Sequence, residues 1–169
     1  MLYLKVLNLE EAEKEYRFFQ EIESENGFEN QYNGISYEEF VKEVIPARLQ
    51  AAKGINLQEG YVADTYFLLW DDEQIVGLFK VRHELNDFLR NGPGHIGYGI
   101  HPAYRRMGYA SRGLALALNE AKKLLPKEEK EVYLSCHLDN PASLKVQLNN
   151  GAYIHHQDER EYYTRIKIR

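Results

Sequence analysis

Two neighbouring arginines stand just ahead of a glycine in the stretch YRRMGYAS, residues 104–111. The first turn of a helix leaves backbone N–H groups unpaired and concentrates positive dipole potential, so a loop leading into a helix can hold an anion. Gly108 allows close approach, and Arg105 and Arg106 add charges suited to phosphate oxygens. We therefore predict a pyrophosphate site around the N–H groups of residues 107–110. An exposed arginine pair at a helix start fits this segment equally well.

A second unusual segment is the predicted strand HIGYGI, residues 95–100. Because side chains alternate along a strand, His95, Gly97 and Gly99 share one face and Tyr98 lies on the other. Glycine weakens a strand interior, so a pair on one face indicates close approach by a ligand or by another backbone. A helix packed tightly against that face is the competing interpretation.

The hydrophobic pattern predicts the elements that must position these two segments. Runs rich in apolar and β-branched residues predict strands, including a hairpin around the acidic turn 71–73, at residues 2–7, 62–85, 95–100, 131–138, 152–158 and 161–169. Apolar residues at helical spacing predict helices at residues 8–23, 36–53, 112–125 and 140–151. With no repeat or low-complexity linker, residues 1–169 are expected to form one domain.

Local signals refine these helices. Asn8 and Glu11 have the spacing of a capping box, and Asn140 is a candidate cap ahead of Pro141. The predicted apolar face of the second helix comprises Phe40, Val44, Ala47 and Ala51. Pro46 predicts a kink within that helix.

Composition narrows the classes of partner. The formal charge of −5 and a pI near 5.7 argue against a general nucleic-acid binder, which needs a broad basic face. The densest apolar cluster, residues 66–70, is too short to cross a bilayer, and the N-terminus lacks the features of a secretion signal. A single cysteine, Cys136, excludes an internal disulfide. We expect a soluble cytoplasmic protein with no nucleic-acid or membrane partner.

The order of these features resembles the GNAT superfamily of acetyl-CoA-dependent N-acyltransferases. Its pyrophosphate loop reads Q/RxxGxG/A, matched here by Arg105, Gly108 and Ala110. The family then carries an Asn, a small residue and a Gly, matched by Asn140, Ser143 and Gly151, and the resemblance is clearest from about Gln74 to Gly151. No Walker loop is present, and the stretch GYGIHP has only the first two glycines of a dinucleotide fingerprint.

The resemblance implies an α/β (α+β) fold with a mixed, twisted sheet of about six to seven strands and about four helices. The strands at 95–100 and 131–136 would splay apart and admit the pantetheine arm of acetyl-CoA, the expected co-substrate. The contacts it implies come from the backbone of Gly99 and Ile100, from the loop residues Arg105, Arg106, Met107, Gly108, Tyr109, Ala110 and Ser111, and from Asn140 and Ser143. Asn140 can equally be only a helix cap.

The implied chemistry is direct transfer of an acetyl group to an amine while both substrates are bound. A lysine-type amine is protonated at pH 7, so a base must accept a proton, and His95 and Glu84 are the candidates. A backbone N–H near Tyr98 to Ile100 could hold the oxyanion. Many family members place a proton-donating tyrosine where this chain has Gln147. Tyr98, Tyr153 or a water molecule could replace it.

Other features favour no further chemistry. Cys136 is expected to be a buried, inert thiol, and His155 and His156 should point to opposite faces of a strand, so no metal site is predicted. The function classes left open are an N-acetyltransferase acting on a small molecule or a peptide, a non-catalytic acyl-CoA-binding or sensor domain, and a structural partner-binding domain. The acceptor site is expected within about residues 24–59, and the terminal strand could support a homodimer.

Overall fold

The strands form two antiparallel sheets in the computed structural model, which describes residues 1–24 and 28–169. The first sheet has the order β1-β2-β3-β4, with bounds Leu2–Val6, Asp64–Asp71, Gln74–Arg82 and Ile96–Ile100. The second has the order β5-β7-β6, with bounds Glu131–His137, Glu161–Lys167 and Tyr153–Gln157. The expected α+β class is confirmed, and the predicted mixed sheet is divided in two between β4 and β5.

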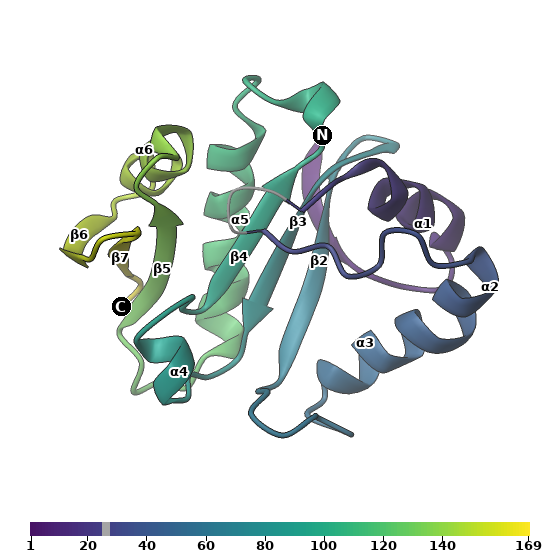
Figure 1. Cartoon of the computed structure of the whole chain (residues 1–169), viewed down its shortest axis with the longest axis horizontal. Helices are drawn as coiled ribbons and strands as arrows, with labels where there is room; N and C mark the ends of the chain where they lie inside the picture. Colours follow the sequence, from purple (N-terminus) through teal and green to yellow (C-terminus); the bar gives the residue numbers. More distant parts are fainter. Residues whose placement is uncertain (25–27) are drawn as a thin grey trace.

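Helices cover both faces of the first sheet. Their bounds are Ala12–Glu21 for α1, Tyr37–Glu39 for α2, Ile45–Ala51 for α3, Asp87–Arg90 for α4, Tyr109–Leu124 for α5 and Pro141–Asn149 for α6. A π-helical turn, Phe40–Val44, joins α2 to α3, and a 3-10 turn, Pro102–Tyr104, precedes α5. Figure 1 shows α1, α2 and α3 on one side of the sheet and α5 beside β4 on the other. Among the described residues, no helix is long and apolar enough to cross a membrane.

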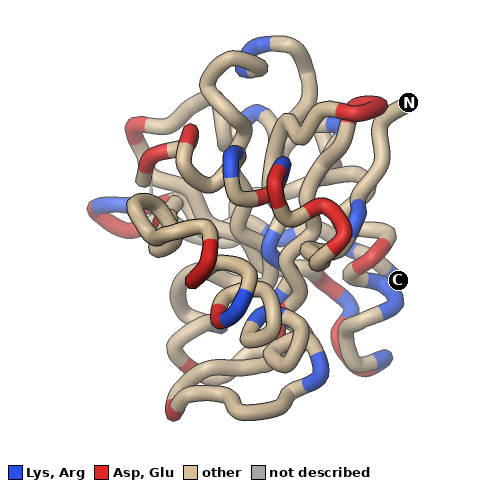
Figure 2. The backbone as a smooth tube through the Cα atoms, turned by 90° about the vertical axis from the view of Figure 1, so that its right-hand side faces the viewer, with Lys and Arg blue, Asp and Glu red and all other residues tan. Residues whose placement is uncertain are grey.

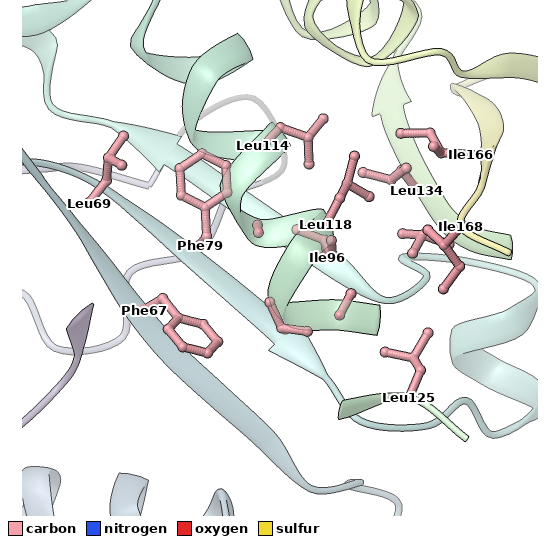
Figure 3. Packing of buried hydrophobic residues seen from close by; sticks show 14 of the residues in the cluster. Phe67, Leu69, Phe79, Ile96, Leu114, Leu118, Leu125, Leu134, Ile166 and Ile168 are labelled. Carbon is pink, nitrogen blue, oxygen red and sulfur yellow. The ribbon is translucent and has the colours of Figure 1, made fainter. Parts of the chain in front are cut away.

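The alternation of side chains along the strands separates two hydrophobic cores. On β2, Phe67 and Leu69 face α5 and join the residues of β3, β5 and β7 shown in Figure 3. Tyr66, Leu68 and Trp70 face the opposite way, toward α1 and α3. Since the central strands contribute to both cores, the position of each strand residue decides which layer it stabilises. Figure 2 shows basic and acidic residues interspersed over the α1–α3 side rather than gathered by sign.

The two N-terminal helices differ in detail from the sequence prediction. Asn8 Oδ1 accepts from Glu11 N at 3.1 Å, but α1 begins only at Ala12. The expected kink at Pro46 takes the form of the π turn, whose cap Ile45 donates to the carbonyl of Phe40. This wider turn shifts the helical register by one residue. Ile45 is therefore buried and Ala47 is exposed, so the prediction of an apolar face containing Ala47 was wrong.

One glycine of α5 sets how closely this helix packs on the sheet. A Cβ at Gly113 would lie 2.5 Å from the Phe79 ring and 2.8 Å from Leu69 Cδ2. Alanine normally stabilises a helix by up to about 1 kcal/mol relative to glycine. Here we expect Gly113→Ala to destabilise the protein by about 1–2 kcal/mol, because overpacking exceeds the gain in helix propensity. Urea unfolding measures this, and a raised midpoint would show that α5 can move away from the sheet.

Candidate active site

The central feature of the site is the separation of β4 from β5. The two strands begin close together, where His95 N donates to Tyr133 O at 2.7 Å. A Cβ at Gly94 would lie 2.1 Å from that same carbonyl oxygen, so this approach requires glycine. Beyond it the strands belong to different sheets and diverge in Figure 1. β4 is thus an edge strand, and an edge presents N–H and C=O groups that can pair with an extended ligand.

The loop after β4 leads into α5 as an open helix start. Gly108, its N-cap, has φ +81°, and in the part of the chain that the structure describes no side chain caps this helix. The preceding Arg106 also has a positive φ, +63°. Such left-handed residues beside a helix start turn successive N–H groups toward one point, which is how backbone loops hold anions. This start of α5 could therefore accept an anion.

Side chains around this loop hold its shape. Arg105 Nε donates to Ile100 O at 3.1 Å, which ties the loop to the end of β4. Arg112 Nη2 donates to Met107 O at 3.2 Å, and its guanidinium lies 4.9 Å from the centre of the Tyr109 ring. Asn150 Nδ2 donates to Ser111 O at 3.0 Å and so joins α6 to the first turn of α5. Gly108 and the residues Arg105, Arg106 and Met107 are exposed, so an incoming ligand can reach them.

The two glycines of β4 have different surroundings. A Cβ at Gly99 would lie 3.3 Å from the ring of Phe28, so an aromatic side chain from the loop after α1 covers this position. Among the described residues, the nearest neighbour of Gly99 on this face is therefore an aromatic ring rather than a packed helix. At Gly97 no described atom lies within 4 Å of such a Cβ. The glycine face of β4 is therefore covered at one position and open at the other.

A polar network spans the gap on the opposite face. The Tyr98 hydroxyl lies 2.6 Å from Ser143 Oγ and accepts from Gln147 Nε2 at 3.4 Å. Gln147 is fully buried; its Nε2 also donates to Ser135 O at 3.1 Å, and its Oε1 accepts from Thr164 Oγ1 at 2.6 Å. Burial raises the pKa of Tyr98 above its ordinary value, so the phenol keeps its proton at neutral pH.

The structure places the other predicted site residues as follows. His95 is fully buried at the closed end of the gap, and its Nδ1 accepts from Tyr133 N at 2.9 Å. Burial, with help from Arg90 and Arg82, lowers the His95 pKa to about 3. Glu84 is exposed just beyond β3. Asn140 Oδ1 accepts from Ser143 N at 3.1 Å, so Asn140 caps α6.

A family model described as the acetyltransferase (GNAT) family matches residues 12–147. The chain belongs to the GNAT family. It is therefore an acyltransferase of a family that uses acetyl-CoA. No curated protein matches the chain by sequence.

Solved GNAT structures share the fold at low sequence identity. The ribosomal-protein α-N-acetyltransferase RimL in complex with coenzyme A is 16% identical, with a TM-score of 0.67 over 99% of this chain and 94% of that one. The microcin self-immunity acetyltransferase MccE, in complex with acetyl-CoA and AMP, is 14% identical, with a TM-score of 0.68 over 98% and 92%. Mutant forms of the spermidine/spermine N-acetyltransferase SpeG from Vibrio cholerae are 15% identical, with a TM-score of 0.63 over 99% of this chain and 95% of that one.

Some features of the site were not predicted from the sequence. The sequence identifies Gln147 only as the replacement for a tyrosine, yet this residue is the centre of a network that joins α6 to β4, β5 and β7.

The expectation that His155 and His156 point to opposite faces was wrong, because a β-bulge between Ile154 and His156 brings their Nδ1 atoms within 2.8 Å of each other. Among the described residues no cluster of three or more metal-ligating side chains occurs. Burial raises the pKa of Cys136 to about 11, which fits an unreactive thiol.

Proposed function

We propose that the protein transfers the acetyl group of acetyl-CoA to an amine of a small molecule or peptide while both are bound. The observation that carries this proposal is the open edge of β4, which leads directly into the uncapped start of α5. An extended pantetheine arm can pair with such an edge while the pyrophosphate meets the N–H groups of the loop. Because the two cores share β2 and β3, we also propose that residues 1–169 act as one domain.

The proposed contacts to acetyl-CoA divide along its length. The pyrophosphate binds the backbone from Met107 to Ser111 with Arg105 and Arg106 beside it, and the arm pairs with the backbone at Gly99 and Ile100. Asn140 already accepts from Ser143 N, and the Ser143 hydroxyl binds Tyr98, so we propose that Asn140 and Ser143 shape the gap and touch the arm only at its edge. Residues 25–27 of the region proposed for the acceptor lie outside the described residues.

The acceptor must lose a proton before or during its attack on the thioester carbonyl. His95 suits this task poorly, because a fully buried imidazole with a pKa of about 3 that already accepts a backbone N–H is a structural group. Glu84 is exposed, and it remains the candidate base, acting through water. A backbone N–H of β4 near Tyr98 to Ile100 would stabilise the oxyanion, as fixed dipoles do in acyl transfer.

Tyr98 is the proposed acid for the departing thiolate. The family places a tyrosine where this chain has Gln147, and the Tyr98 hydroxyl lies 3.4 Å from Gln147 Nε2. We infer that the phenol serves in place of the family tyrosine, because its hydroxyl contacts the side chain at that position. The alternative, Tyr153, lies on the outer strand β6, where its hydroxyl binds Glu131.

One experiment separates this proposal from its alternatives. Acetyl-CoA affinity is measured by calorimetry, and release of the free thiol is then followed with a panel of amines. We expect binding together with amine-dependent thiol release. Binding without release from any amine would identify an acyl-CoA sensor instead, and the absence of binding would leave a structural role.

A further inference from the structure

A group of charged side chains lies on the α3 side of the first sheet, outside the residues assigned to acetyl-CoA. Arg48 of α3 and Lys80 of β3 approach the carboxylate of Asp64 on β2, with Nη1–Oδ1 and Nζ–Oδ2 distances of 3.2 and 3.5 Å. Both cations also lie over the Tyr66 ring, 4.6 and 5.7 Å from its centre. We call these four residues the Arg48–Lys80 cluster.

The cluster contains two positively charged side chains and one negatively charged side chain, so its net charge is positive. Two cations share one carboxylate, although only 16% of the Arg48 side chain and 22% of the Lys80 side chain are exposed. Arg48 and Asp64 form an ion pair, but Asp64 Oδ1 accepts no hydrogen bond from any described residue. An excess charge with little water around it favours an anion more strongly than an exposed cation does.

The register of the sheet connects this cluster to the proposed acetyl site. Tyr66 pairs with Lys80 across β2 and β3, and Lys80 pairs with Gly97 across β3 and β4. Cross-strand partners share a face, so all three lie in one row on the α3 side. Gly97, the member of this row on the splayed strand, is the open position of β4. An acceptor lying over Gly97 would therefore have the cluster beside it.

We propose that the acceptor is an amine that also carries a carboxylate, held by Lys80 and Arg48 while the amine lies over Gly97. This inference rests on the proposed acetyltransferase function and names the substrate class of the same site. The net positive charge of the cluster suits an anion such as a carboxylate. Arg82, on the same face, adds positive potential, but its Nη1 donates to Gly94 O at 3.0 Å, which keeps it at the start of β4.

A structural role alone does not account for the cluster. The contact of Arg48 with Asp64 already joins α3 to β2, and a second cation adds repulsion to that pair. Lys80 is therefore the residue that separates the two roles. Neighbouring strands are roughly 4.8 Å apart, so the carboxylate would lie roughly 5–10 Å from β4. That distance favours acceptors with several bonds between the amine and the carboxylate.

The test uses acceptors matched in length that differ only in charge. Thiol release is measured with glycine, β-alanine and 4-aminobutyrate, and with the amide of each. We expect kcat/KM to be at least about 10-fold higher for 4-aminobutyrate than for its amide, and higher for 4-aminobutyrate than for glycine. A dipeptide, glycylglycine, distinguishes a peptide carboxylate from that of a free amino acid. O-phosphoethanolamine is included as well, and its preference over every carboxylate would overturn the proposal in favour of a phosphate site.

Variants at Lys80 connect this preference to the cluster. Lys80→Met keeps the aliphatic stem and should lower kcat/KM for the carboxylate acceptors about 10- to 100-fold, which is the range for losing a charge-assisted hydrogen bond. Rates with the amides should stay within about 3-fold, and Lys80→Arg should restore the preference. Lys123→Met is the matched control, because Lys123 pairs only with Glu120 in the described contacts on α5.

The outcomes also separate this inference from the proposed function. Equal kcat/KM values for the carboxylate acceptors and their amides would refute the carboxylate site and leave the acetyltransferase function intact. The same conclusion would follow if Lys80→Met lowered kcat/KM equally for the carboxylates and the amides. If acetyl-CoA binds but no amine is acetylated, calorimetric titration of 4-aminobutyrate into the protein saturated with coenzyme A tests the carboxylate site directly. Binding that disappears in Lys80→Met supports the site, and absence of binding refutes it.

Discussion

Replacing Gly108 with aspartate should weaken acetyl-CoA binding at least about 100-fold. The new carboxylate would stand at the N-cap of α5, where the pyrophosphate is proposed to bind. At an effective dielectric constant of about 20, two like charges roughly 5 Å apart repel by about 3 kcal/mol, which corresponds to more than 100-fold in affinity. Isothermal titration of acetyl-CoA into the purified variant measures the effect.

The fold should survive this change. A Cβ at Gly108 would meet only Arg112 Nε, at an ordinary contact distance of 3.8 Å. The φ of +81° costs a residue other than glycine on the order of 1 kcal/mol, and Asp and Asn adopt this region more readily than most. Gly108→Asn is therefore the matched control, since it has the same shape and backbone strain without the charge.

Comparing the two variants shows whether the anion lies at the start of α5. Gly108→Asn should bind acetyl-CoA within about 10-fold of the wild type, and thermal unfolding should show similar midpoints for both variants. If Gly108→Asp bound acetyl-CoA as tightly as Gly108→Asn, the anion would not lie at this helix start. The assignment of the loop would then be wrong, whatever the enzyme's activity.

The loop and helix starts that we propose for acetyl-CoA could be predicted from the sequence because short stretches of chain specify them. The glycine after Arg105 and Arg106, the apolar helix that follows and the cap at Asn140 are all local signals, and α6 begins at Pro141 as predicted. The splaying of β4 from β5 is not a local property. It came from the family resemblance, and the structure shows its physical basis in the Gly94 contact and the separate sheets.

Features that depend on contacts across the fold were not predictable in this way. Gln147, Thr164 and Tyr98 are far apart in sequence and meet only after three elements have packed. Arg48 of α3 and Asp64 of β2 form their ion pair only in the folded chain, and Pro46 alone predicted a kink rather than the π turn before α3. Buried polar networks of this kind need partners that no periodicity reveals.

The second large effect is expected at Tyr98. Tyr98→Phe removes the hydroxyl beside Gln147 and keeps the ring, which stacks on Phe79 with their centres 5.5 Å apart. A positioned acid contributes about 10²- to 10⁴-fold in rate, and a thiolate leaves more easily than an amine. We therefore expect kcat to fall about 100-fold, at the lower end of that range, with acetyl-CoA affinity changed less than 3-fold. Steady-state thiol release and calorimetry measure the two quantities.

The pH dependence tests whether the Tyr98 phenol is protonated throughout the working range. Burial raises the Tyr98 pKa above its ordinary value of about 10, so the wild-type phenol stays protonated up to about pH 9. The loss in Tyr98→Phe should therefore be the same at every pH from about 6 to 9 with the best amine found.

Tyr163→Phe is the matched control, because the Tyr163 hydroxyl binds Asp158 at 2.7 Å near the turn between β6 and β7, outside the gap. It should retain kcat within about 2-fold. If Tyr98→Phe did the same, water would be the proton donor, and the network around Gln147 would serve only to hold β4 and α6 together. Ser143 also binds the Tyr98 hydroxyl. If water is the donor, Ser143→Ala should leave kcat unchanged. If the phenol is the donor, Ser143→Ala should lower kcat, because the hydroxyl loses a partner that positions it.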